Sequence, residues 1–487
     1  MARYKAYNTV QMYFETINIE AELPQDNRAR IIKEIINSMD VSSFDKNYNN
    51  DKKGANANDI RMMLGLLFLA GMRGIRGSRS IAGIMKHDLE FKYILAGHKA
   101  PDDSAIRKFR SRHVKEYAVL FSKIVHIASA LGMMDFGALS IDGTKVQAYA
   151  SLYETKNRKG LEKSMGLLSK RMEKMLRRMD TEEYPEVMEE LEKRRNAIEK
   201  RQEALSDFET ILSTYPEEDR VNRVDPDARL MKKSDGKSII GHNAQAAVET
   251  GEHGIIVAAE LSQKATDESL LFDIAEKAEE NCDEEFDTIL GDAGYITYES
   301  MEQAAHEGKN ILGPDRQYNT ERNGKEKKGD FAKLKFKYNT EDDSYLCPGN
   351  HTFEFQRITE TKASPLISEY FNKEACAACK LAPMCCAKTQ PYRVIQRDYR
   401  ELLRENIREK LDSNKGFLLY GKRSQTVETS FGNVKQNKGV RQLFYRSLEM
   451  ADAEWKNICI GINISKIVTY LQGKEWKFLL NMAFNSI

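Results

Sequence analysis

Apolar residues recur every three or four positions between residues 58 and 96, with Ile60 and Leu64 on one face, and this spacing predicts helices. Pro101 then ends one element, and Asp102, Asp103 or Ser104 can cap the next, which carries four basic residues. We therefore expect the first 130 residues to be mainly helical.

A second helical pattern, highly charged, occupies residues 155–220. Apolar residues alternate spacings of three and four from Met165 to Met179, and recur every seven positions from Leu191 to Leu212. A polar break separates the two stretches. The pattern predicts a helical hairpin or short coiled coil, whose apolar stripe serves packing rather than cofactor binding.

Strand patterns lie on both sides of this hairpin. Stretches with strand patterns occupy residues 138–141, 239–248, 255–261 and 286–290, and a Gly-containing turn joins the second stretch to the third as a β-hairpin. Lys145–Tyr149 is predicted to be a separate, neighbouring strand. Helical patterns alternate with these strands, and a long apolar helix is expected over residues 445–472, so the core is predicted to be α/β.

Bulk composition narrows the class of protein. No apolar stretch is long enough to cross a bilayer, and the first residues lack the apolar core of a signal peptide, so a cytoplasmic protein is expected. The net charge is only +1, yet residues 52–123 hold 15 basic against 6 acidic residues. Such local basic surfaces suit a polyanionic partner, although ordinary solvated faces would give the same count.

Three carboxylates occupy positions that a two-metal nuclease would require. Asp142 follows one apolar run, Asp292 follows another, and Glu428 lies in a segment with a helical pattern. Carboxylates at strand ends project from the carboxyl edge of a sheet, where ligands of α/β folds collect. If the three converge, they can hold two Mg²⁺ ions, with Asp142 as the bridge, for phosphodiester cleavage or transfer.

Each acid alone is weak evidence. An Asp before Gly at a strand end is commonly a turn former, and a helical Glu commonly faces water. The prediction depends on their order, which is strand, strand and helix. On one helix, Lys435 would lie two turns from Glu428 on nearly the same face, where a basic group neutralises phosphates.

Four motifs around these residues resemble DDE transposases of bacterial insertion sequences. Tyr420, Arg423, Glu428 and Lys435 resemble the signature Y-x2-R-x3-E-x6-K, with four residues instead of three between Arg and Glu. Asp142–Lys145 resembles the first-acid motif, and Asp292–Tyr295 resembles the second, D-x-G-Y. Gly241–Gln245 is similar to the strand G-Y-N-x-Q, with His for Tyr, and Pro101–Arg110 resembles the N-terminal region of many members.

The resemblance covers about residues 55–470 and implies a ribonuclease-H-like mixed sheet with flanking helices. The expected organisation is a helical N-terminal DNA-binding domain (1–130), a catalytic core (131–154, 235–314 and 398–475), a helical-hairpin insertion (155–220) and a basic, Cys-rich insertion (315–397).

The implied activity is that of a transposase that binds terminal inverted repeats, cleaves the ends and joins the 3′-hydroxyls to target DNA. Mg²⁺ would serve it, with Mn²⁺ as a substitute, and it would act as an oligomer on paired ends in the bacterial cytoplasm, near the nucleoid. The residues expected to contact DNA are Arg107, Lys108, Arg110, Arg112, Lys145, Tyr420, Arg423 and Lys435.

The cysteines resemble a zinc-binding insert. Cys376 and Cys379 form a C-x2-C half-site, and Cys347 with Cys385 could complete a tetrahedral set. His351 and Cys386 are rival ligands, and reduced cysteines in a loop without metal are the alternative.

Two other functions remain open. A catalytically silent DNA-binding derivative would bind repeats without nicking them, and the presence of all three acids disfavours it. A metal-dependent nuclease with the same core would hydrolyse DNA without joining ends.

Overall fold

The computed structural model describes residues 18–48, 56–233, 235–322, 331–361, 364–387 and 389–486. The chain divides into two units, residues 1–132 with 456–487, and residues 133–455. The sequence pattern had assigned residues 398–475 entirely to the catalytic core. In the structure the boundary instead falls within one long helix, α19 (Leu448–Leu471).

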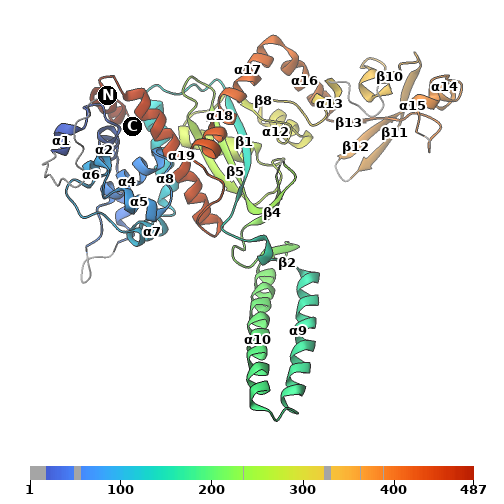
Figure 1. The fold of residues 1–487 in the computed structure, drawn as a ribbon. Helices are drawn as coiled ribbons and strands as arrows, with labels where there is room; N and C mark the ends of the chain where they lie inside the picture. The colour runs from blue at the N-terminus through green and yellow to red at the C-terminus, as the bar shows by residue number, and fades with distance from the viewer. Residues whose placement is uncertain are drawn as a thin grey trace, which may run out of the picture. The chain divides into compact units, whose positions relative to one another are not determined.

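The first unit is helical over its described residues (Figure 1). Its helices are α1 (Ile19–Glu22), α2 (Arg28–Ser38), α3 (Ser42–Asp45), α4 (Ile60–Met72), α5 (Ser78–Ile84), α6 (Leu89–Leu95), α7 (Asp103–Arg112), α8 (Glu116–Ala130), the end of α19, and α20 (Trp476–Ser486). Helices α4 and α19 approach closely at Gly71 and Gly461, where a Cβ on Gly461 would stand 2.8 Å from the Gly71 carbonyl carbon. Only glycine permits this backbone contact. Of the three candidate caps of α7, Asp102 is the one that caps it, because its carboxylate accepts a hydrogen bond from Ala105 N at 2.7 Å.

A mixed sheet forms the centre of the second unit. Its strand order is β4-β5-β1-β7-β8, and β6 also pairs with β5. The strands are β1 (Leu139–Gln147), β4 (Arg229–Lys232), β5 (Ser238–Glu249), β6 (Ile256–Ser262), β7 (Thr288–Leu290) and β8 (Asn310–Leu312). Strand β1 is antiparallel to β5 and parallel to β7, which is parallel to β8. The predicted β5–β6 hairpin is confirmed. Two helices follow β6 and β7 in the chain, α11 (Leu271–Cys282) and α12 (Tyr298–Glu307).

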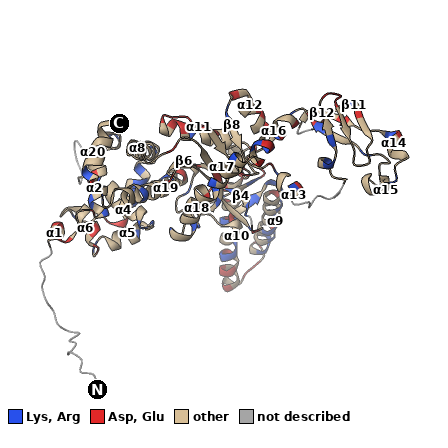
Figure 2. Cartoon of the chain, turned by 90° about the horizontal axis from the view of Figure 1, so that it is seen from above, with Lys and Arg blue, Asp and Glu red and all other residues tan. Residues whose placement is uncertain are grey.

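The predicted helical hairpin is present between β1 and β4. Helices α9 (Arg158–Met179) and α10 (Pro185–Thr214) lie side by side, and β2 (Thr155–Asn157) pairs with β3 (Arg220–Asn222) at their base, next to η1 (Leu152–Glu154). Leu168, Ile198 and Leu205 are among the residues that form its own apolar seam. Figure 2 marks basic and acidic residues on the hairpin, and α10 pairs several of them at i,i+4 spacing. The seam confirms the packing role predicted for these apolar residues.

The Cys-rich segment contains a five-stranded antiparallel sheet that the sequence pattern did not predict, in the order β13-β12-β11-β10-β9. Its strands are β9 (Lys337–Asn339), β10 (Ser344–Leu346), β11 (Thr352–Thr361), β12 (Ser364–Tyr370) and β13 (Ile395–Asp398). The short helices nearby are α13 (Tyr318–Arg322), η3 (Lys333–Lys335), α14 (Lys373–Ala377) and α15 (Ala382–Cys385). Phe336, Tyr345, Phe353 and Tyr370 are among the residues of a small core of its own.

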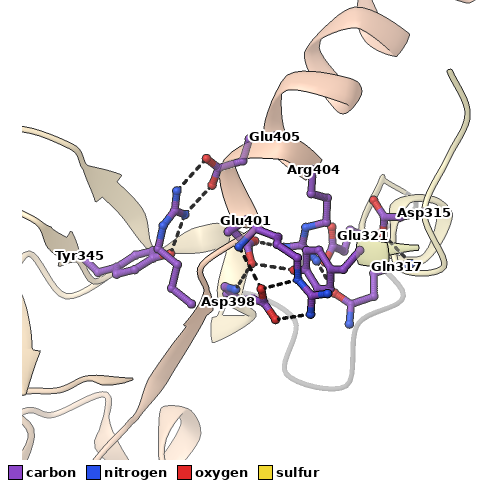
Figure 3. Close-up of polar contacts among 12 residues, drawn as sticks. Asp315, Gln317, Glu321, Tyr345, Asp398, Glu401, Arg404 and Glu405 are labelled. Atoms are coloured by element: carbon purple, nitrogen blue, oxygen red, sulfur yellow. Dashed lines mark hydrogen bonds and ion pairs between the residues drawn. The ribbon is translucent and has the colours of Figure 1, made fainter. Parts of the chain in front are cut away.

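Ion pairs join this five-stranded sheet to α16 (Glu401–Asp412), as Figure 3 shows. Arg397 of β13 forms a two-point contact with Glu405, at 2.7 and 3.0 Å. The buried Glu401 accepts from Tyr298 at 2.9 Å and from Lys333 at 3.0 Å, and also pairs with Arg404. Buried charges with this many partners favour one geometry of the contact between the five-stranded sheet and α16.

Three short elements follow α16, where the sequence pattern had predicted one helix. They are α17 (Asn414–Gln425), α18 (Val427–Gly432) and a π-helical turn, η4 (Asn433–Asn437). Thr426, with φ −109° and ψ −84°, breaks the helix between Arg423 and Glu428. The single-helix prediction was therefore wrong. The extra residue of the Tyr420–Lys435 motif falls in the segment that contains this break.

None of the helices in the described parts of the chain is both long and apolar enough to cross a membrane.

Candidate active site

Asp142 lies in the middle of β1 rather than at its end. Strand β1 continues to Gln147, so Lys145 belongs to the same strand and not to a neighbouring one, as the sequence had suggested. The parallel pairing of β1 with β7, however, ends at Ser140 and Leu290. Asp142 and Asp292 each come two residues after that pair, so they lie next to one another where the two parallel strands diverge.

The Asp142 carboxyl is largely buried, with its side chain 22% exposed. Burial raises its pKa to about 6, and the charges of Asp292 and Asp267 add to the rise, while Arg423 and the Gly143 amide oppose it. Neighbouring carboxylates raise a pKa in this way only at short range. Asp142, Asp292 and Asp267 therefore form one electrostatic cluster.

Arg423 links Asp142 to Glu428. Its guanidinium donates to the Ile141 carbonyl at 3.1 Å and lies 3.3 Å from Asp142 Oδ1 and 3.9 Å from Glu428 Oε1. The Arg423 side chain is 6% exposed, whereas that of Glu428 is 54% exposed. A buried cation thus stands between two acids that belong to different elements.

The other two residues of the same motif also lie at this site. Burial raises the pKa of Tyr420, and Arg423, hydrogen-bonded to its hydroxyl, opposes that rise. Burial lowers the pKa of Lys435, and the charge of Asp142 opposes that fall. The structure therefore brings Tyr420, Arg423, Glu428 and Lys435 into the neighbourhood of Asp142.

Asp292 begins a turn after β7. Its Oδ1 accepts from Gly294 N at 2.8 Å, and the next residue, Tyr295, is fully buried. The Tyr295 hydroxyl donates to Gln245 Oε1, so the second-acid motif is tied to strand β5. Burial raises the pKa of Tyr295 well above its usual value, and the site carboxylates add to this, so the hydroxyl stays a donor.

Asp267 is a site residue that the sequence analysis did not identify. The segment Thr266–Ser269 has the composition of a helix cap, but the N-cap of α11 is Leu270 and no side chain caps that helix. Asp267 Oδ1 instead accepts from Asn243 Nδ2 at 2.6 Å and Gln245 Nε2 at 2.9 Å, and lies 3.4 Å from Lys145 Nζ. The signal in the sequence was a pair of amide residues, Asn243 and Gln245, on one face of a predicted strand, since buried amides require partners.

The described residues contain no group of three or more His, Cys, Asp or Glu already arranged to hold a metal ion. The donor set nevertheless fits a hard divalent cation, because Asp142, Asp292 and Glu428 supply carboxylate oxygens and Arg423 occupies the space between two of them. Asp142, Asp292 and Glu428 would hold it.

The basic residues of α7 differ in exposure. Arg107 and Lys108 are exposed, and Arg112 is exposed beside the ring of Tyr48. Arg110 is buried, and its guanidinium donates to the Arg76 carbonyl at 2.8 Å. The structure therefore does not support a DNA contact for Arg110, whose side chain holds α7 against the loop between α4 and α5.

The cysteines meet around one small cavity. It is lined by Cys347, Cys376, Cys379, Cys385, Cys386 and His351. A Cβ on Gly349 would lie 3.6 Å from Cys347 Sγ and 3.7 Å from Cys379 Sγ. Burial raises the pKa of Cys376, and Cys386 and Cys347 are close enough to add to that rise.

Comparison with models of known protein families indicates the class of protein to which the chain is similar. A transposase DDE domain model matches residues 346–468, and a transposase domain model of otherwise undescribed function matches residues 17–112. Both matches are to transposase domains, and together they support a DDE transposase of the insertion-sequence type. The first match contains Glu428 and the cysteines, whereas Asp142 and Asp292 lie outside it. No curated protein matches the chain.

As a transposase, the protein is an enzyme of the nuclease type whose substrate is DNA. Transposases of the DDE class use divalent metal ions in general. The carboxylates beside β1 and β7 are therefore the natural place to look for the chemistry.

Proposed function

We propose that this transposase binds the terminal inverted repeats of an insertion sequence, cleaves its ends and joins the 3′-hydroxyls to target DNA, with Asp142, Asp292 and Glu428 as the catalytic acids. The observation that carries the proposal is the meeting of these acids. Asp142 and Asp292 follow paired residues of two parallel strands, and Arg423 joins Asp142 to Glu428.

The fold proposed for this core is ribonuclease-H-like. In the order β6-β5-β1-β7-β8, the first three strands are antiparallel and the last two run parallel to β1. On this proposal the helical hairpin (155–220) and the Cys-rich segment (315–397) are insertions, and residues 1–130 form the DNA-binding domain.

The chemistry follows from the site residues. Divalent Mg²⁺, or Mn²⁺ in its place, would activate the attacking oxygen and stabilise the leaving oxygen. On this proposal Asp142, Asp292 and Glu428 would hold the ions, and Asp142 would be the ligand shared between them. Arg423 neutralises Asp142 and Glu428 before any cation arrives, and Lys145 and Lys435 offer charge to the phosphates of the bound strand.

Exposed basic side chains on α7 support DNA binding by the first unit. Arg107, Lys108 and Arg112 are exposed on one capped helix, which suits contact with phosphates. Action on two repeat ends at once would require more than one copy of the chain.

The decisive experiment incubates the purified full chain with inverted-repeat DNA, a target plasmid and Mg²⁺, and sequences the products. Joined ends support the transposase proposal. Hydrolysis without joining would favour a metal-dependent nuclease, and repeat binding without nicking would favour a silent derivative; either result would overturn it.

Metal affinity is expected to depend on pH through Asp142. The pKa of this carboxyl is about 6 without metal, so below pH 6 a cation must displace its proton. The apparent affinity for Mn²⁺ should fall about tenfold per pH unit between pH 6 and pH 5, and stay nearly constant above pH 7. Calorimetric titration of the DNA-free protein with Mn²⁺ measures this. An affinity that stays flat from pH 5 to pH 7 would contradict the assignment of Asp142 as a ligand.

We also propose that the cysteines hold a structural Zn²⁺, with Cys347, Cys376 and Cys379 as ligands and Cys385 or Cys386 as the fourth. Thiolates are suitable donors, and the small core of this sheet is of the size that a metal commonly stabilises.

About one zinc per chain is therefore expected by elemental analysis, and Cys376→Ser should lose it. Cys282→Ala is the matched control, since Cys282 is buried in α11 outside the cluster. Protein that binds no zinc after refolding with it would contradict the zinc proposal and leave the catalytic proposal intact.

A further inference from the structure

Asp267 lies where the motifs of two catalytic acids meet. A Cβ on Gly143, directly after Asp142, would stand 2.9 Å from Asp267 Oδ1 and 2.3 Å from Gln245 Nε2. A Cβ on Gly294, in the Asp292 turn, would stand 3.7 Å from Asp267 Oδ2 and 3.0 Å from Asp292 Oδ1. Gly143 therefore leaves the room that the Asp267 carboxylate occupies, and Gly294 borders the same carboxylate.

The two oxygens of Asp267 have different surroundings. Oδ1 accepts hydrogen bonds from the side-chain amides of Asn243 and Gln245, and it is the oxygen nearest the Lys145 ammonium. These contacts fix the carboxylate plane, because Asn243 and Gln245 are themselves fully buried in β5. Two further hydrogen bonds hold Gln245 in place. The Tyr295 hydroxyl donates to Gln245 Oε1, and the Trp455 indole N–H donates to the Gln245 backbone carbonyl at 2.9 Å. The other oxygen, Oδ2, lies beside the Asp292 turn, 3.7 Å from where a Cβ on Gly294 would stand.

The charge of Asp267 also reaches the catalytic acids. It contributes to the raised pKa of Asp142, and it is the largest of the charges that hold up the pKa of Lys145 against burial. An acid held this close to two others without a cation raises the free energy of the metal-free site. Lys145 offsets part of that cost, and a divalent ion would offset the rest.

We propose that Asp267 is a fourth carboxylate of the metal centre, which supplies Oδ2 to the ion held by Asp292 while Asn243, Gln245 and Lys145 hold Oδ1. This inference rests on the proposed function, because it assigns a ligand to the same site. It also gives the strand motif Gly241–Gln245 a role, since its two amides orient this carboxylate.

The substitution Asp267→Asn distinguishes the roles of the two carboxylate oxygens. Three donors surround the Oδ1 position, so the amide oxygen of the variant takes that place and its NH₂ group takes the place of Oδ2. The local hydrogen bonds persist, whereas an NH₂ group cannot bind a cation. Asp273→Asn is the matched control, because Asp273 is an exposed acid of α11 that pairs with Lys264 at 3.8 Å.

The test titrates the full chain with Mn²⁺ alone and follows free Mn²⁺ by electron paramagnetic resonance. Asp267→Asn and Asp142→Asn are each expected to weaken Mn²⁺ binding by about tenfold or more, and Asp273→Asn to leave it unchanged. Thermal unfolding in EDTA should show that all three variants fold.

The outcomes separate the two proposals. If Asp142→Asn weakens Mn²⁺ binding and Asp267→Asn does not, Asp267 is only the counter-ion of Lys145 and the inference is overturned, while the proposed function stands. If neither variant weakens binding, the metal site itself is wrongly assigned.

Discussion

Asp142→Asn is expected to reduce DNA strand cleavage by about 1000-fold or more and to leave inverted-repeat binding within about twofold of the parent. Metal ions contribute several kcal/mol of charge stabilisation in the transition state of phosphoryl transfer, and each 1.4 kcal/mol is about a factor of ten in rate. An asparagine amide removes the charge of the proposed bridging ligand. It also removes a buried acid whose pKa is already raised to about 6, so the folded protein tolerates the change.

The measurement compares single-turnover cleavage of labelled repeat DNA at saturating Mg²⁺ with affinity measured in Ca²⁺ or EDTA. Asp287→Asn is a suitable control, because Asp287 is exposed at the start of the β7 segment and is remote from Asp292 in the turn beyond it. Cleavage retained by Asp142→Asn at the control's rate would end the assignment. Loss of both cleavage and repeat binding would instead indicate damage to the fold.

Much of the fold could be predicted because its helices and central strands bury apolar faces with regular periods. The helical hairpin and the β5–β6 pair are examples, and both appear with nearly the expected bounds. Strand β1 was predicted only in part. Its second half contains Gly143 and Lys145, which face the polar site, so the apolar run stops at Ile141 although the strand continues.

The five-stranded sheet was missed for a related reason. Strand β11 has exposed residues along most of its length, with Phe353 as its buried residue. A strand that is exposed to solvent on both faces has no alternation of apolar and polar residues that could be detected in the sequence. Its antiparallel neighbours, which cannot be seen in the local sequence, hold it in place.

The residues of the site show the same contrast between local sequence patterns and long-range contacts. Asp142, Asp292 and Glu428 could be proposed because each stands in a recognisable local motif. Asp267 could not, because Thr266–Ser269 has the composition of a helix cap, and only contacts with two residues of β5, 22 and 24 positions earlier, reveal its place. Residues that serve a site through long-range contacts carry little local signal.

Arg423→Ala is expected to destabilise the metal-free protein by about 1.5–3 kcal/mol at pH 7, and Mg²⁺ should recover much of that loss. The guanidinium lies 3.3 Å from Asp142 Oδ1 and donates to the Ile141 carbonyl at 3.1 Å, and hydrogen bonds to charged groups contribute about this much. Without Arg423 the pKa of Asp142 should rise above its present value of about 6, since Arg423 is the largest influence that lowers it. A larger fraction of Asp142 would then be protonated at neutral pH in the absence of metal.

Urea unfolding in EDTA and in excess Mg²⁺ measures the difference, with Lys415→Ala, an exposed position on the same helix, as the control. A divalent ion can replace the missing positive charge between Asp142 and Glu428, so the variant should gain more stability from Mg²⁺ than the parent does. Equal gains in the two proteins would mean that Arg423 and the metal do not act on the same carboxylates. The catalytic acids would then have to be sought elsewhere, because an ion held by Asp142 cannot be indifferent to the loss of the cation beside it.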